Sequence, residues 1–205
     1  MVNPARRLIW TVSVVCTLGA ADLLAPSLSG AQANSASPTP LISLNTCSPA
    51  ALSQPFAPWG DFASYELVPG GDFENSTWTL SGGAKLVTGS EPYSATGTRG
   101  SSSLSLPGAS SAQSPLTCVD ATYVSIRFFI AGNGSVAVNV VDGSSVIPAG
   151  VAVAGGEWAP TPVMLTSSAV LAAPSSGTAQ VSVAFTGLSG SPRIDDVFID
   201  PWSRG

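Results

Sequence analysis

The chain has 205 residues, a formal net charge of −5, and charged side chains at only 9% of its positions, against about 25% in an average soluble protein. It contains no histidine, which excludes Ser-His-Asp and Cys-His catalysis and His-ligated metal sites. The negative charge gives no electrostatic footprint for nucleic acid. The composition therefore favours a β-rich domain that is not an enzyme and binds no nucleic acid.

Residues 1–33 have the pattern of a secretory signal peptide. Arg6 and Arg7 precede an apolar stretch, residues 8–21, which is short for a transmembrane helix. Ala31-Gln32-Ala33 supplies the small residues that a signal peptidase requires. We expect cleavage after Ala33 and a secreted or extracellular protein with no membrane attachment. Cleavage two residues earlier and an uncleaved membrane anchor are the alternatives.

Two cysteines, Cys47 and Cys118, remain after this cleavage. In an exported chain such a pair indicates a disulfide, which would stabilise the fold by about 4 kcal/mol through loop closure. The alternative is two reduced, buried thiols.

Residues 34–62 are predicted to be a linker followed by an irregular segment. Residues 34–40 are polar and contain proline, residues 41–45 are a candidate strand, and residues 48–61 are rich in Pro and Ala. We expect this irregular part to lie along the surface of the domain formed by residues 63–205.

From residue 63 onward, short strand patterns alternate with Gly-rich turn signals such as Gly132-Asn133-Gly134 and Gly155-Gly156. Many short strands separated by turns indicate an all-β antiparallel β-sandwich, or jelly roll. The expected strands are residues 64–68, 76–80, 84–88, 102–106, 114–119, 122–130, 135–141, 151–154, 163–167, 179–186 and 193–199.

The clearest of these strands have apolar residues at every second position, which is typical of half-buried strands. In residues 122–130 one face carries Val124, Ile126, Phe128 and Ile130, and the other carries Tyr123, Ser125, Arg127 and Phe129. We expect the first of these faces to lie in the core.

A series of short motifs resembles the galactose-binding-like jelly rolls, in particular the carbohydrate-binding modules of bacterial cellulases and xylanases. The series covers about residues 66–201 and opens with Gly71-Asp72-Phe73-Glu74 and Trp78. It closes with Ile194-Asp195-Asp196-Val197, and between these ends lie Gly100-Ser101-Ser102-Ser103-Leu104, a strand from Tyr123 to Phe128, and Gly156-Glu157-Trp158.

The resemblance implies a structural calcium ion where the two ends of the module meet, with Glu74 and one of Asp195 and Asp196 as ligands. Calcium takes six to eight oxygen ligands, so carboxylates and backbone carbonyls suit it. The alternative is that Asp195 is solvated or pairs with Arg193. A glycosidase pair is disfavoured because the chain lacks the dense carboxylate strands of jelly-roll glycosidases.

The resemblance also implies sugar binding, for which exposed aromatic rings and a few polar groups are needed. The candidates for a concave sheet face are Tyr123, Arg127 and Asn139, and those for a rim platform are Trp59, Tyr93 and Trp202. Trp78 and Trp158 are expected in the core.

We therefore expect a secreted, non-catalytic carbohydrate-binding-like module whose partner is a polysaccharide or cell-surface glycan. The alternative is an exported structural or interaction protein with the same fold and no sugar binding. An exposed aromatic platform favours the first function, and a smooth face of Ser, Thr and Ala favours the second.

Overall fold

A computed structural model describes residues 51–119, 123–168, 170 and 178–201. These residues belong to one compact unit, residues 44–205. The expected signal peptide, the linker at residues 34–40, Cys47 and Trp202 lie outside the described residues. Within them, no helix is long and apolar enough to span a membrane.

The described part of the chain contains twelve strands and one short 3-10 helix, η1. The elements are β1 (Leu52–Ser53), η1 (Ala57–Trp59), β2 (Tyr65–Leu67), β3 (Thr79–Ser81), β4 (Lys85–Thr88), β5 (Ser102–Ser105), β6 (Ser111–Gln113), β7 (Thr117–Val119), β8 (Ser125–Asp142), β9 (Ser145–Pro160), β10 (Met164–Leu165), β11 (Ala179–Gly190) and β12 (Arg193–Asp200).

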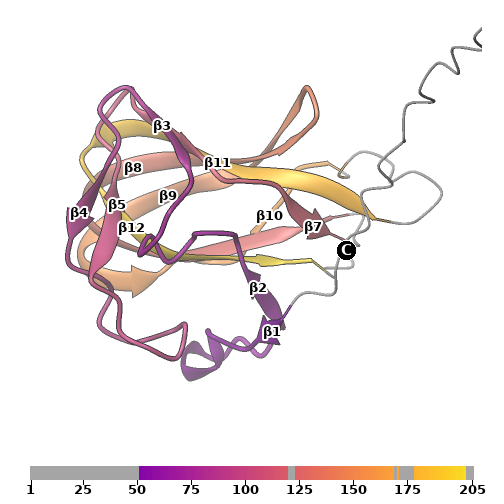
Figure 1. Ribbon diagram of the computed structural model, residues 1–205, viewed down its shortest axis with the longest axis horizontal. Helices are drawn as coiled ribbons and strands as arrows, with labels where there is room; N and C mark the ends of the chain where they lie inside the picture. The colour runs from indigo at the N-terminus through magenta and orange to yellow at the C-terminus, as the bar shows by residue number, and fades with distance from the viewer. Residues whose placement is uncertain (1–50, 120–122, 169, 171–177, 202–205) are drawn as a thin grey trace, which may run out of the picture. The chain divides into compact units, whose positions relative to one another are not determined.

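All strand pairs are antiparallel, and the sheet order β1-β2-β12-β8-β11-β6-β3 curls around one apolar core (Figure 1). The first part of β8 pairs with β12 and β10, and its second part pairs with β11. Strand β9 pairs along most of β8. The expected all-β antiparallel β-sandwich is confirmed.

Strand β8 is longer than the sequence pattern predicts. Residues 122–130 and 135–141 were expected as two strands joined by a turn at Gly132-Asn133-Gly134, but β8 runs without interruption through them. Gly132 and Gly134 have φ values of +84° and +112°, and the pairing with β9 shifts register between Ile130 and Gly132. The glycines thus form a bulge that bends the strand, a role for which their freedom at positive φ suits them.

The outer face of the first part of β8 is buried, although the alternation predicts a half-exposed strand. Phe129 is inaccessible to solvent and lies in a second apolar cluster with Phe56, Tyr65 and Phe198. Phe56 comes from residues 51–63, which we call the strap. The strap, which was expected to lie irregularly on the surface, is therefore held by the buried ring of Phe56, and it covers one face of the sheet.

The two tryptophans expected in the core have different environments. Trp78 is buried and stacks on Phe185 in the main core, with a centroid distance of 5.6 Å. Trp158 is only half-buried and packs against the second cluster. The prediction was right for Trp78 and wrong for Trp158, because β9 extends past its Gly-Gly pair and carries Trp158 to the outer face.

Candidate functional site

Two exposed aromatic rings from distant parts of the chain meet on the surface. Trp59 ends η1 in the strap, and Tyr93 lies in the loop between β4 and β5; their ring centroids are 5.0 Å apart and their planes are 83° apart. Trp59 is 38% exposed and Tyr93 is 46% exposed. The structure thus brings together two of the three residues expected in a rim platform, and we call them the aromatic pair. In Figure 1 the indigo strap and the magenta loop after β4 approach each other below the sandwich.

The aromatic pair rests on the buried ring of Phe129 in β8. The Phe129 centroid is 5.4 Å from that of Trp59 and 5.5 Å from that of Tyr93. The strand therefore provides a fixed floor for rings that come from two separate loops.

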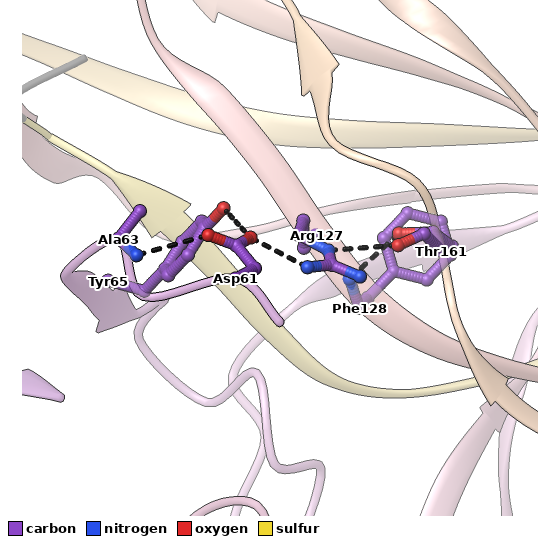
Figure 2. Close-up of polar contacts among 6 residues, drawn as sticks. All are labelled: Asp61, Ala63, Tyr65, Arg127, Phe128 and Thr161. Atoms are coloured by element: carbon purple, nitrogen blue, oxygen red, sulfur yellow. Dashed lines mark hydrogen bonds and ion pairs between the residues drawn. The ribbon is translucent and has the colours of Figure 1, made fainter. Parts of the chain in front are cut away.

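Asp61 fastens the strap to the sheet. Its Oδ2 accepts hydrogen bonds from the Tyr65 hydroxyl at 2.7 Å and from Arg127 Nη1 at 2.6 Å, and its Oδ1 accepts one from the Ala63 N–H at 3.0 Å (Figure 2). Burial alone would raise the pKa of Asp61, but these hydrogen bonds hold it below its ordinary value of 3.8. The carboxylate is thus ionised and paired at neutral pH.

Arg127 is a structural residue and not part of an open binding face. It is 7% exposed, its Nε donates to the Thr161 carbonyl at 2.9 Å, and its guanidinium lies 4.2 Å over the Phe56 ring. The prediction that Arg127 lines a concave binding surface was wrong, because Asp61 and the strap cover it.

Arg127 and Asn139 also do not share a site. Arg127 lies opposite Phe198 in β12, whereas Asn139 lies opposite Ala184 in β11. They are twelve positions apart in β8, roughly 40 Å along an extended strand. Tyr123 precedes β8 and is half-buried, so the three residues proposed for the concave face do not form one surface.

The loop that carries Tyr93 is held by a buried carboxylate, Glu91. Its Oε1 accepts a hydrogen bond from the Ala95 N–H at 3.0 Å, and its Oε2 accepts one from the Tyr93 N–H. The Tyr93 hydroxyl donates to the Trp158 carbonyl at 2.7 Å. Sequence reasoning missed Glu91; the available signal was an acid without a basic neighbour in a Gly- and Ser-rich loop, where backbone N–H groups need acceptors.

Glu91 is joined to the two aspartates of the closing motif. Its N–H donates to Asp195 Oδ2 at 2.8 Å, and the Asp196 N–H donates to Asp195 Oδ1 at 2.9 Å. Burial raises the pKa of Asp195 to about 6. Burial, followed by the charges of Asp195 and Glu91, raises the pKa of Asp196 to about 8.

The alternative proposed for Asp195, a solvated side chain or an ion pair with Arg193, was wrong. Asp195 is fully buried, and the Arg193 Nη2 donates instead to Ser103 Oγ at 2.7 Å and to the Thr88 carbonyl at 3.0 Å. Both aspartates are buried because Asp196 has a φ of +45° and the pairing with β8 shifts register after Asp195. This irregularity removes the strict alternation of faces.

Glu74, the other expected calcium ligand, is hydrogen-bonded to Ser101 and Ser102. Its Oε1 accepts hydrogen bonds from the N–H groups of Ser101 at 2.6 Å and Ser102 at 2.7 Å, and its Oε2 accepts one from Ser101 Oγ at 2.6 Å. The carboxylates that act on Asp196 are Asp195, Glu91 and Asp72. The two ends of the domain do adjoin, because the Val197 N–H donates to the Gly71 carbonyl at 3.0 Å.

The carboxylates of Glu91, Asp195 and Asp196 have donor chemistry that suits a hard cation. Across the part of the chain that the structure covers, no group of three or more His, Cys, Asp or Glu side chains is arranged to hold a metal. Calcium also accepts carbonyl and water oxygens, however, so two carboxylates suffice for part of its shell. Burial is the main cause of the raised pKa of Asp196, and the charges of Asp195 and Glu91 add to it; a divalent cation would relieve this second contribution.

A cleft of about 430 Å³ is bordered by the same two segments that carry the aromatic pair. Its lining includes Leu52 and Gln54 of the strap and Ala95 and Thr96 of the Tyr93 loop. The surface beside these segments is therefore hollowed and not flat.

Of the two cysteines expected to form a disulfide, Cys118 lies in β7 opposite Gln180 of β11. Cys47 is outside the described residues, so the pairing stays a prediction.

No protein-family model and no curated protein matches the chain. Solved structures do align with it, at low sequence identity. The TmCBM61 module, solved with β-1,4-galactotriose, aligns over 65% of this chain and 96% of its own at 21% identity and a TM-score of 0.42. The Stig cyclase Fisc from Fischerella sp. TAU aligns over 68% and 100% at 10% identity and a TM-score of 0.43. The enzymatically active domain of tailspike protein 4 of bacteriophage CBA120 aligns over 63% of this chain at 17% identity and a TM-score of 0.41, and the match spans only 20% of the tailspike chain.

Proposed function

We propose that this protein is a non-catalytic carbohydrate-binding module that uses the aromatic pair as its ligand platform. One observation carries the proposal: Trp59 and Tyr93 are both substantially exposed, yet they lie 5.0 Å apart on a buried floor. Exposed aromatic rings held in place offer apolar faces to the C–H faces of sugars at low entropic cost.

A binding role is favoured over catalysis by the use of the nearby carboxylates. The oxygens of Glu91 and Asp195 accept backbone N–H groups, so these side chains hold the loop and the closing strand in place. A glycosidase needs a pair of carboxyl groups on either side of an accessible bond, and both of these side chains are fully buried.

The test is binding of the purified protein to a glycan array, followed by titration calorimetry with any sugar that binds. Trp59→Ala and Tyr93→Ala should each weaken binding at least tenfold. Leu188→Ala is the matched control, because Leu188 is 52% exposed and lies outside the aromatic pair. Equal affinity in all four proteins would refute this site.

A second function, as an exported interaction protein, is favoured by one other surface. The outward side of β9 carries exposed Val146, Val151 and Val153, and β9 pairs only with β8 among the described strands. Long apolar edge strands are sites of chain association. This function would be favoured if sedimentation analysis showed a dimer for the native protein and a monomer for Val151→Lys, and if the protein bound no sugar.

We also propose that the protein is exported and contains structural calcium. Export is supported by the pattern of residues 1–33, and N-terminal sequencing of secreted protein tests it. Calcium would be held by Asp195 and Asp196, with Glu91 beside them. The bound calcium ion would neutralise the negative charge of these buried carboxylates.

A further inference from the structure

We infer that two copies of this protein associate face to face through the outer side of β9, the second part of β8 and β11. We call this surface the uncharged face; it comprises the outward side chains of residues 146–153, 135–141 and 182–189. The inference goes beyond sugar binding, because the aromatic pair rests on Phe129 in the first part of β8. It also specifies the second function, since the contact is a sheet face and not the edge of β9.

The uncharged face contains no Asp, Glu, Lys or Arg in any of its three segments. One row of outward side chains, in register across five strands, consists of Pro148, Asn139, Ala184, Gln113 and Thr79. Beside this row, Val151 is 57% exposed and Val153 is 71% exposed. The surface is therefore built from small or apolar side chains, which suits an interface.

Hydroxyl groups on this side of the sheet are hydrogen-bonded to each other. Ser135 Oγ and Ser189 Oγ lie 2.9 Å apart, and Ser81 Oγ and Ser111 Oγ lie 2.7 Å apart. A polar group that is already hydrogen-bonded loses little free energy when it is buried, and burial of the exposed valines favours association. Removing water from this face is therefore favourable.

The charge of the chain favours a second copy as the partner. In a two-fold dimer a surface patch contacts the same patch of the other copy, so a charged patch would repel itself and an uncharged one does not. The chain has a net charge of −5, which makes two copies repel each other elsewhere. The uncharged face is where this repulsion is smallest.

The uncharged face is large enough for a dimer. With strands about 4.8 Å apart and about 3.3 Å per residue, β9, β8 and β11 together with β6 and β3 present roughly 500 Å² per copy. Two copies would bury roughly 1,000 Å², which is the lower limit for a specific interface. Sheets also pack on one another face to face in β-sandwiches. A reversible dimer is the expected result.

The edge of β9 that faces away from β8 is less suited to pairing with a second copy. The Pro148 carbonyl already accepts the Ser167 N–H at 2.8 Å, and the Trp158 carbonyl accepts the Tyr93 hydroxyl at 2.7 Å. Pro148 also has no N–H to donate to a new strand. Face-to-face packing leaves these contacts intact, whereas edge pairing would have to replace them.

Sedimentation velocity of the full chain at increasing concentration tests the inference. We expect a monomer–dimer equilibrium and at least tenfold weaker association in both Val153→Lys and Thr186→Lys, because each places a charge in the interface. Leu86→Lys in β4 is the matched control, since Leu86 is 40% exposed and lies outside the face. Val153→Thr keeps the side-chain shape, and hence the fold, and should weaken association roughly fourfold. Added salt should strengthen the dimer by screening the negative charges of the two copies.

The variants also separate the possible contacts. Thr186 lies in β11, which is paired on both sides, so loss of the dimer in Val153→Lys alone would assign the contact to the β9 edge and overturn the inference. A monomer at millimolar concentration, a dimer retained in both lysine variants, a dimer lost in Leu86→Lys, native affinity in Val153→Thr or a dimer weakened by salt would also overturn it. Sugar binding should be the same in the dimer-deficient variants as in the native protein; its absence from all of them would overturn the proposed function and leave this inference standing.

Discussion

Asp61 Oδ2 lies 2.6 Å from Arg127 Nη1, and this ion pair joins the strap to β8. Its side chains are only 18% and 8% exposed, so removing one partner leaves a poorly solvated charge. Arg127→Met should lower the free energy of unfolding by about 3 kcal/mol, measured by urea denaturation. Arg99→Met, at an exposed arginine, is the matched control and should change stability little. A loss no larger than that of the control would show that Asp61 is solvated without its partner.

The same pair should make stability depend on pH in acid. The folded-state pKa of Asp61 lies below its ordinary value of 3.8, so its stabilising contribution is present above that value and is lost as pH falls through the folded pKa. Asp61→Asn should therefore be less stable than the native protein at pH 6, and the difference should shrink below about pH 4. Thermal melts of both proteins across this range measure it; a constant difference would contradict the assignment.

Glu91 should control sugar affinity without touching the sugar. It accepts the N–H groups of Tyr93 and Ala95, and Glu91→Ala leaves these donors without a partner, at about 1–3 kcal/mol for each buried group. We expect a lower melting temperature and weaker sugar binding. Glu157→Ala, at an exposed position of β9, is the control. Glu91→Gln keeps an acceptor and should restore part of the affinity; native affinity in Glu91→Ala would refute the positioning role.

The fold was predictable from the sequence because its strand patterns are local. The apolar faces of Val136, Val138 and Val140 and of Val181 and Val183 all enter the core as the alternation predicts. The burial of the other side of β8 was not predictable from β8 itself, since it depends on Phe56, which lies 73 residues from Phe129 along the chain.

Only those residues of the candidate site were predictable whose type and position outside a strand already suggest an exposed side chain. Trp59 and Tyr93 were found because they are aromatic residues outside the regular strands. Arg127 was misread because its partner, Asp61, is 66 residues away. Glu91 was missed because no periodic pattern marks an acid whose partners are backbone N–H groups in a loop.

Glu66 should make the protein less stable as pH rises. Thr117 Oγ1 donates to its Oε1 at 3.0 Å, but its Oε2 is buried with no hydrogen-bond partner. Burial raises its pKa above the ordinary value of 4.5, so its contribution to stability is full below that value and is lost as pH rises through the folded pKa. Glu66→Gln should melt close to the native protein at pH 4 and above it at pH 8. A gap that narrows with rising pH would contradict this reading.

Calcium should raise the melting temperature through the aspartates and not through Glu74. Asp195 and Asp196 are buried beside Glu91, and their like charges favour protonation of Asp196 in the absence of a cation. A bound Ca²⁺ would offset this repulsion, and a hundredfold excess over Kd would stabilise the fold by about 2.7 kcal/mol. We therefore expect a lower melting temperature in chelator than in calcium, and Asp196→Asn should abolish the difference. Glu74→Gln should retain it, because Glu74 is not among the carboxylates whose charges act on Asp196. Identical melting in calcium and chelator would exclude the ion, and loss of the response in Glu74→Gln alone would move the site to the opening motif.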